Sequence, residues 1–404
     1  MMHSVRVEEL GLNAEKLGRV EDWLKTYVDQ GKIGGAVTLV ARRGQIAQLL
    51  AVGRMDIETD SPMEPDTIFR IYSLTKIVTS VAILMLYDEG RIQLDDPIAR
   101  YIPPFADVKV FAGKEDGEIK LEELRRPITI RHLLTHTAGI GHDALFGSPL
   151  ASVYRKAELA RPDQTLEEMV ERLVQLPLLH QPGEGWNYSI STDVLARLVE
   201  VVSGRRFDEF LRERIFEPLD MVDTGFWVPD YDLHRLATVY SVERNGRLKA
   251  VDTAVSSPYS RERTYLSGSA GLASTPIDFY RFAQMLLSGG EWGGVRILQP
   301  ETVALMTRNH LPESLLPYRM PWRHVQHYTD GCGFGLGVRV VLDLEAWGLP
   351  GSVGEYGWAG ATNTYVWIDP VQEMVLLLFT QLVPFMHWPL DREFKRLVYE
   401  AIEQ

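Results

Sequence analysis

The chain has 404 residues, 45% of them hydrophobic and 24% charged, which is enough apolar sequence for one large globular domain or two. Its formal net charge of −13 argues against general binding to nucleic acid or to an anionic membrane. The one cysteine excludes an internal disulfide, and no apolar run is long enough to predict a membrane span. The N-terminal residues lack the apolar core of a signal peptide, so we expect a cytoplasmic protein.

The first quarter of the chain predicts a helix, two strands and a second helix. Apolar residues recur at helical spacing over residues 12–30, and the β-branched stretch 36–42 predicts a strand. A tight turn at 43–44 leads into a second strand over 46–52. The next helix, over 73–90, is apolar on most of its surface and ends at a glycine.

Strand signals return only near the C-terminus. Residues 91–265 follow a mostly helical pattern with long loops. Short stretches rich in β-branched or aromatic residues then occur at 336–341, 365–368 and 374–380. A final helix is predicted over 390–403.

Strands at both ends and helices between them predict an α+β fold of the α/β-sandwich type. We expect one antiparallel sheet, built from N- and C-terminal strands and flanked by the terminal helices. Residues 1–90 and 266–404 would form this α/β domain, and residues 91–265 a mostly helical domain inserted beside it. The active site would lie between the two. The stretch 311–333 is rich in proline and aromatic residues, and we interpret it as a long ordered loop and a candidate lid.

Ser73 and Lys76 are the first candidate site residues. They stand three apart where a turn leads into the apolar helix, so both lie on one helical face. A serine in the first turn lies near unpaired backbone N–H groups, and a lysine in an apolar site can lose its charge and act as a base.

Tyr188 and the segment 357–361 supply two further motifs. Turn residues place Tyr188 on a loop directly before a helix that starts near Ser191. A tyrosine near a lysine is favoured as phenolate and can accept a proton from a serine. Glycines in a strand, such as Gly360, often mark close approach by a ligand or another backbone, and such a strand can offer an N–H to an oxyanion.

These motifs together resemble the serine β-lactamase-like superfamily, in which the segments corresponding to 73–76, 188–190 and 358–360 occur in the same order. The superfamily includes class C β-lactamases, D-alanyl-D-alanine peptidases, family VIII carboxylesterases and related acyltransferases. The resemblance covers residues 12–403 and includes three supporting stretches, at 133–139, 181–183 and 268–275.

The resemblance implies a role for each matching residue. Ser73 would be the nucleophile, and Lys76 and Tyr188 would share the role of general base. The backbone N–H groups of Ser73 and Ala361 would form the oxyanion hole. The resemblance implies no metal and no organic cofactor.

Two departures from the β-lactamase pattern indicate the substrate class. Trp358 stands where β-lactamases carry a lysine that helps hold a substrate carboxylate, and Ile190 stands where they carry an asparagine that binds an acylamide. At Trp358 the chain resembles the family VIII esterases instead. The absence of both the lysine and the asparagine favours neutral ester substrates. We expect the substrate to contact four residues: Trp358, Ile190, Gly360 and Trp186.

We therefore predict a serine carboxylesterase that cleaves short-chain esters through an acyl-enzyme. A peptidase or β-lactamase on the same scaffold, or an acyltransferase, remains open, as does a non-catalytic sensor of acyl ligands. The expected partner is a small-molecule ester, with neither nucleic acid nor membrane, and a homo-oligomer is compatible with the sequence. The spacing of His132 and His136 could suggest a metal pair, but no third ligand follows, so structural roles are favoured.

Overall fold

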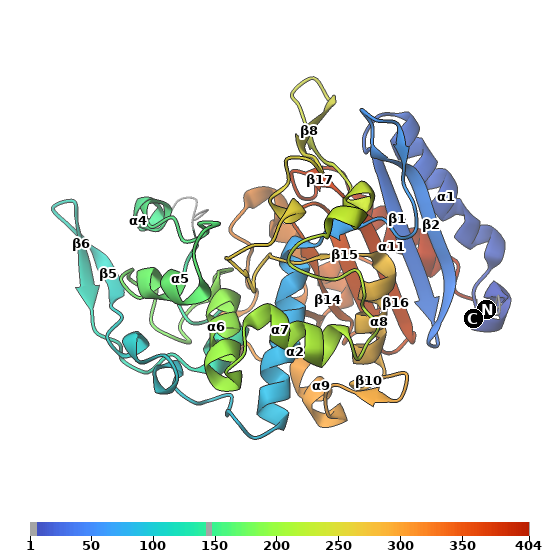
Figure 1. The fold of residues 1–404 in the computed structure, drawn as a ribbon. Coiled ribbons are helices and arrows are strands. Elements are labelled where there is room, and N and C mark those ends of the chain that lie inside the picture. The colour runs from blue at the N-terminus through green and yellow to red at the C-terminus, as the bar shows by residue number, and fades with distance from the viewer. Residues whose placement is uncertain (1–5, 143–147, 404) are drawn as a thin grey trace.

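An antiparallel sheet of eight strands forms one part of the molecule (Figure 1). The computed structural model describes residues 6–142 and 148–403. From one edge to the other, the sheet contains β12 (Cys332–Phe334), β13 (Arg339–Val341), β14 (Tyr356–Gly360), β15 (Thr364–Asp369), β16 (Met374–Thr380), β1 (Gly35–Arg42), β2 (Gln45–Asp56) and β3 (Ser61–Pro62). The predicted α+β fold with a sheet built from both ends of the chain is confirmed.

The two ends of the chain meet where β1 pairs with β16. The register runs from Ala36 opposite Thr380 to Arg42 opposite Met374. Both strands are buried along their whole length because helices cover both faces of the sheet. This explains why these two segments are continuous apolar runs in the sequence.

The terminal helices α1 (Ala14–Asp29) and α11 (Leu390–Glu400) pack together on one face of the sheet (Figure 1). The Glu393 carboxylate joins them, since it accepts hydrogen bonds from the Trp23 indole at 2.7 Å and the Tyr27 hydroxyl at 2.9 Å. Helix α8 (Pro276–Leu287) lies against the other face, opened by the predicted Thr275 cap and the proline that follows it.

Helix α2 (Thr75–Asp88) connects the sheet with the rest of the molecule. Residues 75–86 of this helix are all buried, as expected of a helix that is apolar all round. It packs against α6 (Ser191–Ser203). The remaining helices are α3 (Ile130–Leu134), α4 (Ala151–Lys156), α5 (Leu166–Leu173), α7 (Phe207–Leu211), α9 (Pro300–Met306) and α10 (Leu344–Trp347).

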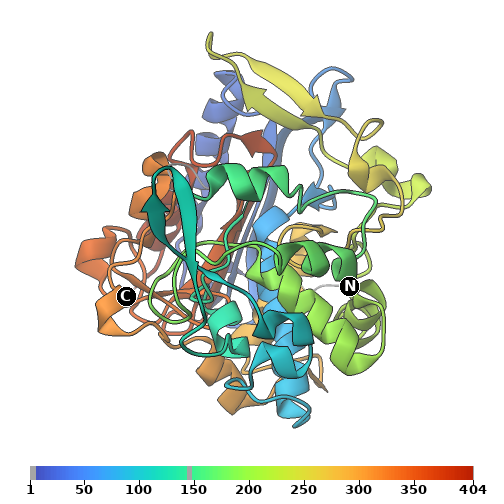
Figure 2. The same ribbon diagram turned by 90° about the vertical axis from the view of Figure 1, so that its left-hand side faces the viewer.

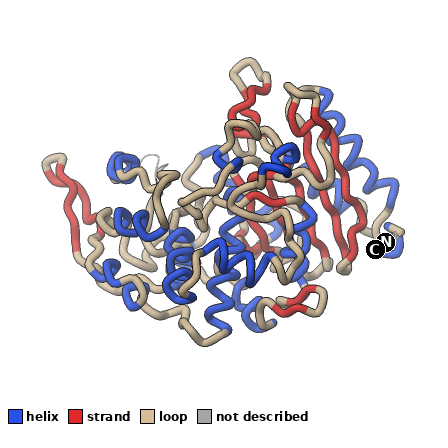
Figure 3. Tube along the Cα trace, in the orientation of Figure 1, coloured by secondary structure: helices blue, strands red, loops and turns tan. Residues whose placement is uncertain are grey.

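The region predicted as mostly helical also contains two β-hairpins. These are β5 (Val110–Glu115) with β6 (Glu118–Glu122), and β7 (Val239–Val242) with β8 (Leu248–Asp252). Figure 2 shows β5–β6 in front and β7–β8 at the top. Apart from these hairpins, helices and loops make up most of this region (Figure 3). Short pairs complete the strands: β4 (Phe69–Arg70) with β9 (Ala273–Ser274), β10 (Glu291–Trp292) with β11 (Val295–Arg296), and β17 (Leu382–Val383) with β7.

The division into two domains at residues 90 and 266 stays a prediction. In the described ranges, no helix combines the length and the apolar character needed to cross a membrane.

Candidate active site

Ser73 is presented by a sharp change of direction between β4 and α2. Tyr72, directly before it, adopts the left-handed conformation with φ of 43°, which is uncommon for a residue with a side chain. Residues 72–74 then form one 3₁₀ turn, and the α-helix begins at Thr75. The predicted helix start at Ser73 is thus a 3₁₀ turn that places the serine immediately before the regular helix.

The end of β14 lies directly against the backbone that leads to Ser73. A Cβ atom at Gly360 would lie 2.4 Å from the carbonyl oxygen of Ile71, so only glycine allows this approach. The Thr362 hydroxyl also donates to the Arg70 carbonyl at 3.3 Å. The close backbone approach expected from a glycine in this strand is present, and it brings Ala361 into the same cavity as Ser73.

Lys76 is buried, with 4% of its surface exposed. Its Nζ donates a hydrogen bond of 2.9 Å to the carbonyl oxygen of Ser269 and lies 4.6 Å from the centroid of the Tyr188 ring. Within the described ranges, Nζ makes no hydrogen bond to the Ser73 hydroxyl. The amine therefore lies over the tyrosine ring and is also held by a backbone oxygen.

Tyr188 lies on the loop directly before α6, as predicted, and its hydroxyl contacts Trp358. The Trp358 Nε1–H donates to the Tyr188 oxygen at 3.3 Å, and the two ring centroids are 5.6 Å apart. A donor in this position stabilises negative charge on the phenolic oxygen. Trp358 thus contacts both the cavity and the tyrosine that the motif predicts as a base.

His136 lies behind Tyr188 and is a neighbour that the sequence did not predict. Its ring centroid is 5.1 Å from that of Tyr188, and its Nδ1 lies 3.0 Å from the Ser189 hydroxyl. Burial and, to a smaller extent, the charge of Lys76 hold the pKa of His136 well below its ordinary value. The neutral imidazole packs against the Tyr188 ring and adds no charge beside it. Across residues 6–142 and 148–403, no group of three or more His, Cys, Asp or Glu side chains could hold a metal ion.

Ser73 opens into a cavity of about 290 Å³ whose walls are mainly apolar and aromatic. Besides Ser73, the lining residues are Tyr188, Met320, Trp322, His324, Val325, Tyr328, Trp358, Ala359, Gly360, Ala361, Val383, Pro384 and Phe385. None of them is Asp, Glu, Lys or Arg. Five of these residues belong to the loop 311–333, which therefore forms part of the cavity wall, while its role as a lid stays a prediction.

Two residues predicted to contact substrate lie outside this lining. Trp186 packs behind Tyr188, with its ring centroid 4.5 Å from that of Tyr318, and Ile190 caps the start of α6. Conversely, Val383 at the end of β17 lines the cavity together with Pro384 and Phe385 directly after it, although no motif marks them. Only their position after the last long strand of the sheet could have suggested this role.

Comparison with known proteins identifies the family of the chain. A family model described as Beta-lactamase matches residues 20–400, so the chain belongs to the β-lactamase family. Esterase EstB of Burkholderia gladioli is 31% identical over 386 residues, which cover 91% of each chain.

Solved structures of the same fold are also similar over nearly the whole chain. EstCE1, described as a hydrolase with promiscuous acyltransferase activity, matches with a TM-score of 0.80 at 26% identity, covering 97% of this chain and 99% of its own. Simvastatin synthase (LovD) from Aspergillus terreus matches with a TM-score of 0.82 at 25% identity, covering 97% and 100%. The resemblance to the β-lactamase-like superfamily is therefore confirmed, while the assignment to the family VIII esterases stays a prediction.

Proposed function

We propose that this protein is a serine carboxylesterase that hydrolyses short-chain esters through an acyl-enzyme on Ser73. The observation that carries the proposal is the cavity shared by Ser73 and Tyr188, which has apolar walls and no acidic, lysine or arginine side chain in its lining. Relatives on this fold that are named as an esterase or a hydrolase support the same reaction class.

In the proposed reaction, the Ser73 hydroxyl attacks the ester carbonyl while Lys76 and Tyr188 take up its proton. The negative charge that forms on the carbonyl oxygen is stabilised by the backbone N–H groups of Ser73 and Ala361. The alcohol leaves with a proton returned through Tyr188. A water molecule, activated by the same pair, then attacks the acyl-enzyme and releases the acid.

The walls of the cavity account for the proposed preference for neutral substrates. Trp358 is 2% exposed and lies where a cation would be needed to pair with a substrate carboxylate. Burying an unpaired carboxylate in this apolar environment would cost several kcal/mol, at least about 3 in measured cases. A neutral ester avoids this cost and gains apolar contacts with the aromatic walls.

The proposal is tested with a fluorophosphonate probe and p-nitrophenyl esters. We expect the probe to label one site, mapped to the peptide that contains Ser73, and to abolish ester hydrolysis in the same proportion as it labels. Labelling of another residue with unchanged Ser73 would overturn the assignment of the nucleophile. Steady hydrolysis by Ser73→Ala at the wild-type rate would overturn the proposal as a whole.

Acyl transfer to an alcohol is a second candidate, favoured by the similarity to LovD and to EstCE1. The same acyl-enzyme would then be attacked by an alcohol in place of water. Adding a small alcohol to the ester assay separates the two activities, because the ester product reports transfer and the free acid reports hydrolysis. We expect free acid to be the main product at low alcohol concentration.

A further inference from the structure

Asp193 is a completely buried carboxylate in the first turn of α6. It accepts hydrogen bonds from the Ser267 hydroxyl at 2.7 Å, from the Tyr265 hydroxyl at 3.1 Å and from the Ser269 hydroxyl. Among the described residues it forms no ion pair. Burying a carboxyl group that only neutral donors satisfy is costly in free energy, so the place of Asp193 beside the active-site loop needs a physical reason.

The donors to Asp193 belong to the loop that holds Lys76. The carbonyl oxygen of Ser269 accepts the 2.9 Å hydrogen bond from Lys76 Nζ, and the hydroxyl of the same residue donates to Asp193. The Thr192 hydroxyl lies 2.7 Å from the Ser269 hydroxyl and fixes it from a second side. One residue thus connects the buried carboxylate to the predicted base.

The loop has little freedom to move by itself. A Cβ atom at Gly268 would lie 2.5 Å from the carbonyl oxygen of Thr192, so the loop lies in direct backbone contact with α6. The Gly268 carbonyl also accepts a hydrogen bond of 2.8 Å from Thr79 on α2. The position of the Ser269 carbonyl is therefore set by α6 and α2 together.

We propose that Asp193 is a positioning residue for Lys76: it holds the Ser269 carbonyl on the amine and supplies the buried negative charge that stabilises the ammonium once Lys76 has taken the proton from Ser73. This inference rests on the proposed function and adds to it a residue outside the three motifs. Opposite charges interact more strongly in a buried, weakly polar environment than in water.

Other titratable groups near these two residues do not supply that charge. His136 faces Lys76 but is held neutral by its burial, and Tyr188 presents its ring face to the amine. Burial and the Asp193 carboxylate raise the pKa of Tyr265 well above its ordinary value, so this phenol remains a neutral donor. Asp193, by contrast, is the carboxyl group that is hydrogen-bonded to Ser269 itself.

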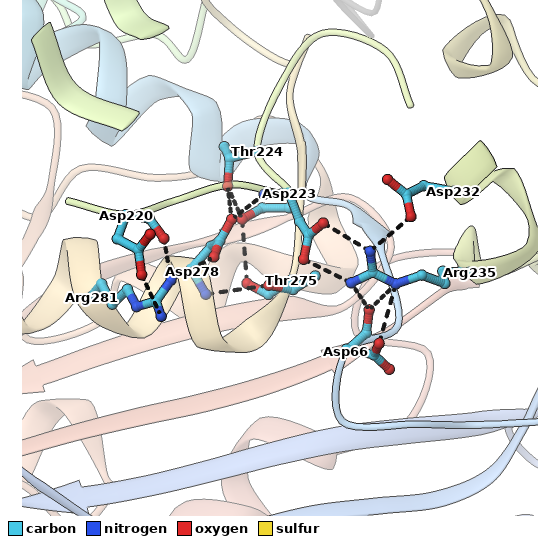
Figure 4. Close-up of polar contacts among 10 residues, drawn as sticks. Asp66, Asp220, Asp223, Thr224, Asp232, Arg235, Thr275, Asp278 and Arg281 are labelled. Atoms are coloured by element: carbon cyan, nitrogen blue, oxygen red, sulfur yellow. Dashed lines mark hydrogen bonds and ion pairs between the residues drawn. The ribbon is translucent and has the colours of Figure 1, made fainter. Parts of the chain in front are cut away.

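The test compares Asp193→Asn with a matched control, Asp278→Asn. Asp278 is also a buried aspartate in the first turn of a helix, and it accepts hydrogen bonds from the Thr224 hydroxyl and the Asp223 N–H (Figure 4). It also pairs with Arg281 at 3.3 Å, and none of these four residues lines the Ser73 cavity. Asparagine keeps the shape of each side chain and removes its charge. Each variant is assayed for kcat and KM on a short p-nitrophenyl ester, for the pH dependence of kcat, and for the rate of fluorophosphonate labelling.

We expect Asp193→Asn to lower kcat and the labelling rate about 10- to 100-fold with KM within twofold, and Asp278→Asn to leave all three unchanged. The acidic limb of the kcat profile should move to lower pH by about 0.5–1 pH unit, because the ammonium form has lost its buried anion. A purely structural role would lower the amount of folded enzyme without moving this limb. A kcat within threefold of wild type with an unmoved limb would overturn the inference.

Ser269→Ala answers the same question should Asp193→Asn fail to fold. This substitution keeps the carbonyl group of residue 269 and removes the hydroxyl group that donates to Asp193. We expect a three- to tenfold loss of kcat at unchanged KM. An unaltered kcat would contradict the inference. Labelling of the wild type distinguishes failure of the proposed function from failure of this inference. A wild-type enzyme that is not labelled on Ser73 contradicts the proposed function. Equal labelling rates of wild type and Asp193→Asn contradict only the role of Asp193.

Discussion

The indole N–H of Trp358 donates a hydrogen bond of 3.3 Å to the hydroxyl oxygen of Tyr188. The motif predicts that Trp358 stands where the β-lactamases of this family carry a lysine. The tryptophan therefore replaces that cation in one respect only: it offers a donor to the tyrosine but no charge to a substrate. This relationship explains how the site can keep its proposed proton-transfer residues while its preference moves to neutral substrates.

Removing this N–H donor should lower the rate of ester hydrolysis even when an aromatic side chain remains in the cavity wall. Trp358→Phe keeps an aromatic ring but loses the N–H, and a neutral hydrogen bond contributes about 0.5–1.5 kcal/mol. We expect kcat on a short p-nitrophenyl ester to fall about three- to tenfold. Trp367→Phe, at a buried tryptophan of the neighbouring strand β15, is the control and should leave kcat unchanged. Equal effects of the two substitutions would contradict the proposed contact.

Loss of any one proposed catalytic group should nearly abolish turnover. Ser73→Ala, Lys76→Ala and Tyr188→Phe should each lower kcat by about 10³-fold or more, and double variants should be little worse because the groups act as one unit. Circular dichroism should stay native. Ser80→Ala, at a buried serine on the same helix α2, serves as control and should retain full activity. If Lys76→Ala kept more than half of the activity, the proposed base would be wrong.

A β-lactam should be a poor substrate compared with an ester. Without a cation at Trp358 and an amide at Ile190, the site lacks one charge-assisted hydrogen bond, typically about 1.5–3 kcal/mol, and one neutral bond of about 1 kcal/mol. Together these lower kcat/KM on the order of a hundredfold to a thousandfold. A chromogenic cephalosporin and p-nitrophenyl acetate measure the ratio.

The engineered pair Trp358→Lys with Ile190→Asn should shift this ratio toward the cephalosporin, provided that the variant folds. Efficient cephalosporin turnover by the native protein would instead favour the peptidase-like alternative.

Acyl chains of two to six carbons should be cleaved faster than chains of twelve or more. The cavity measures about 290 Å³, and Met320, Trp322 and Val325 of the loop 311–333 form part of its wall. A short acyl chain fits in a cavity of this size, whereas a chain of twelve carbons or more would extend beyond it. A series of p-nitrophenyl esters from acetyl to palmitoyl gives kcat/KM for each length, and a maximum at palmitoyl would contradict this preference for short chains.

Asp278 should make stability depend on pH. Burial raises its pKa from the ordinary 3.8 to about 6. Because the folded state holds this proton more tightly than the unfolded state, the stabilisation is fully present below about pH 4 and is lost as pH rises through about 6.

Between pH 4 and 7, the free energy of unfolding of the wild type should therefore fall by about 2–3 kcal/mol relative to Asp278→Asn. Urea unfolding at several pH values measures this difference. Asp220→Asn, at an exposed residue of the same network, is the control and should show little pH dependence relative to wild type (Figure 4). A constant difference between wild type and Asp278→Asn across this range would contradict the raised pKa.

Local patterns predicted much of the sheet and its helices. The predicted strand 374–380 is identical to β16, because a central strand covered on both faces needs a continuous apolar run. Helix α8 begins at the predicted proline, since Thr275 caps it through its own side chain. Hairpin β5–β6 was not predicted, although β6 alternates Glu and Lys with Ile and Leu as a strand does. The segment is short, mostly exposed and rich in Glu and Lys, which are depleted in strands.

The candidate site also contains residues that local patterns predict and residues that they do not. Ser73 and Tyr188 stand at short, strongly patterned motifs, and the structure brings them to one cavity. The walls contributed by Tyr328 and Phe385 come from loops whose positions depend on contacts distant in the sequence. Asp193 carries no local signal at all, since an aspartate in the first turn of a helix is ordinary until its burial beside Ser269 is known.

The most direct test of the central claim is to trap the acyl-enzyme. Wild type and Ser73→Ala are mixed briefly with excess p-nitrophenyl acetate or butyrate, quenched in acid, digested and mapped by mass spectrometry. We predict that the wild-type peptide containing Ser73 gains the mass of one acyl group, matched to the ester used, and that no peptide of Ser73→Ala does so. An acyl group on another residue, or rapid hydrolysis by Ser73→Ala, would contradict the account.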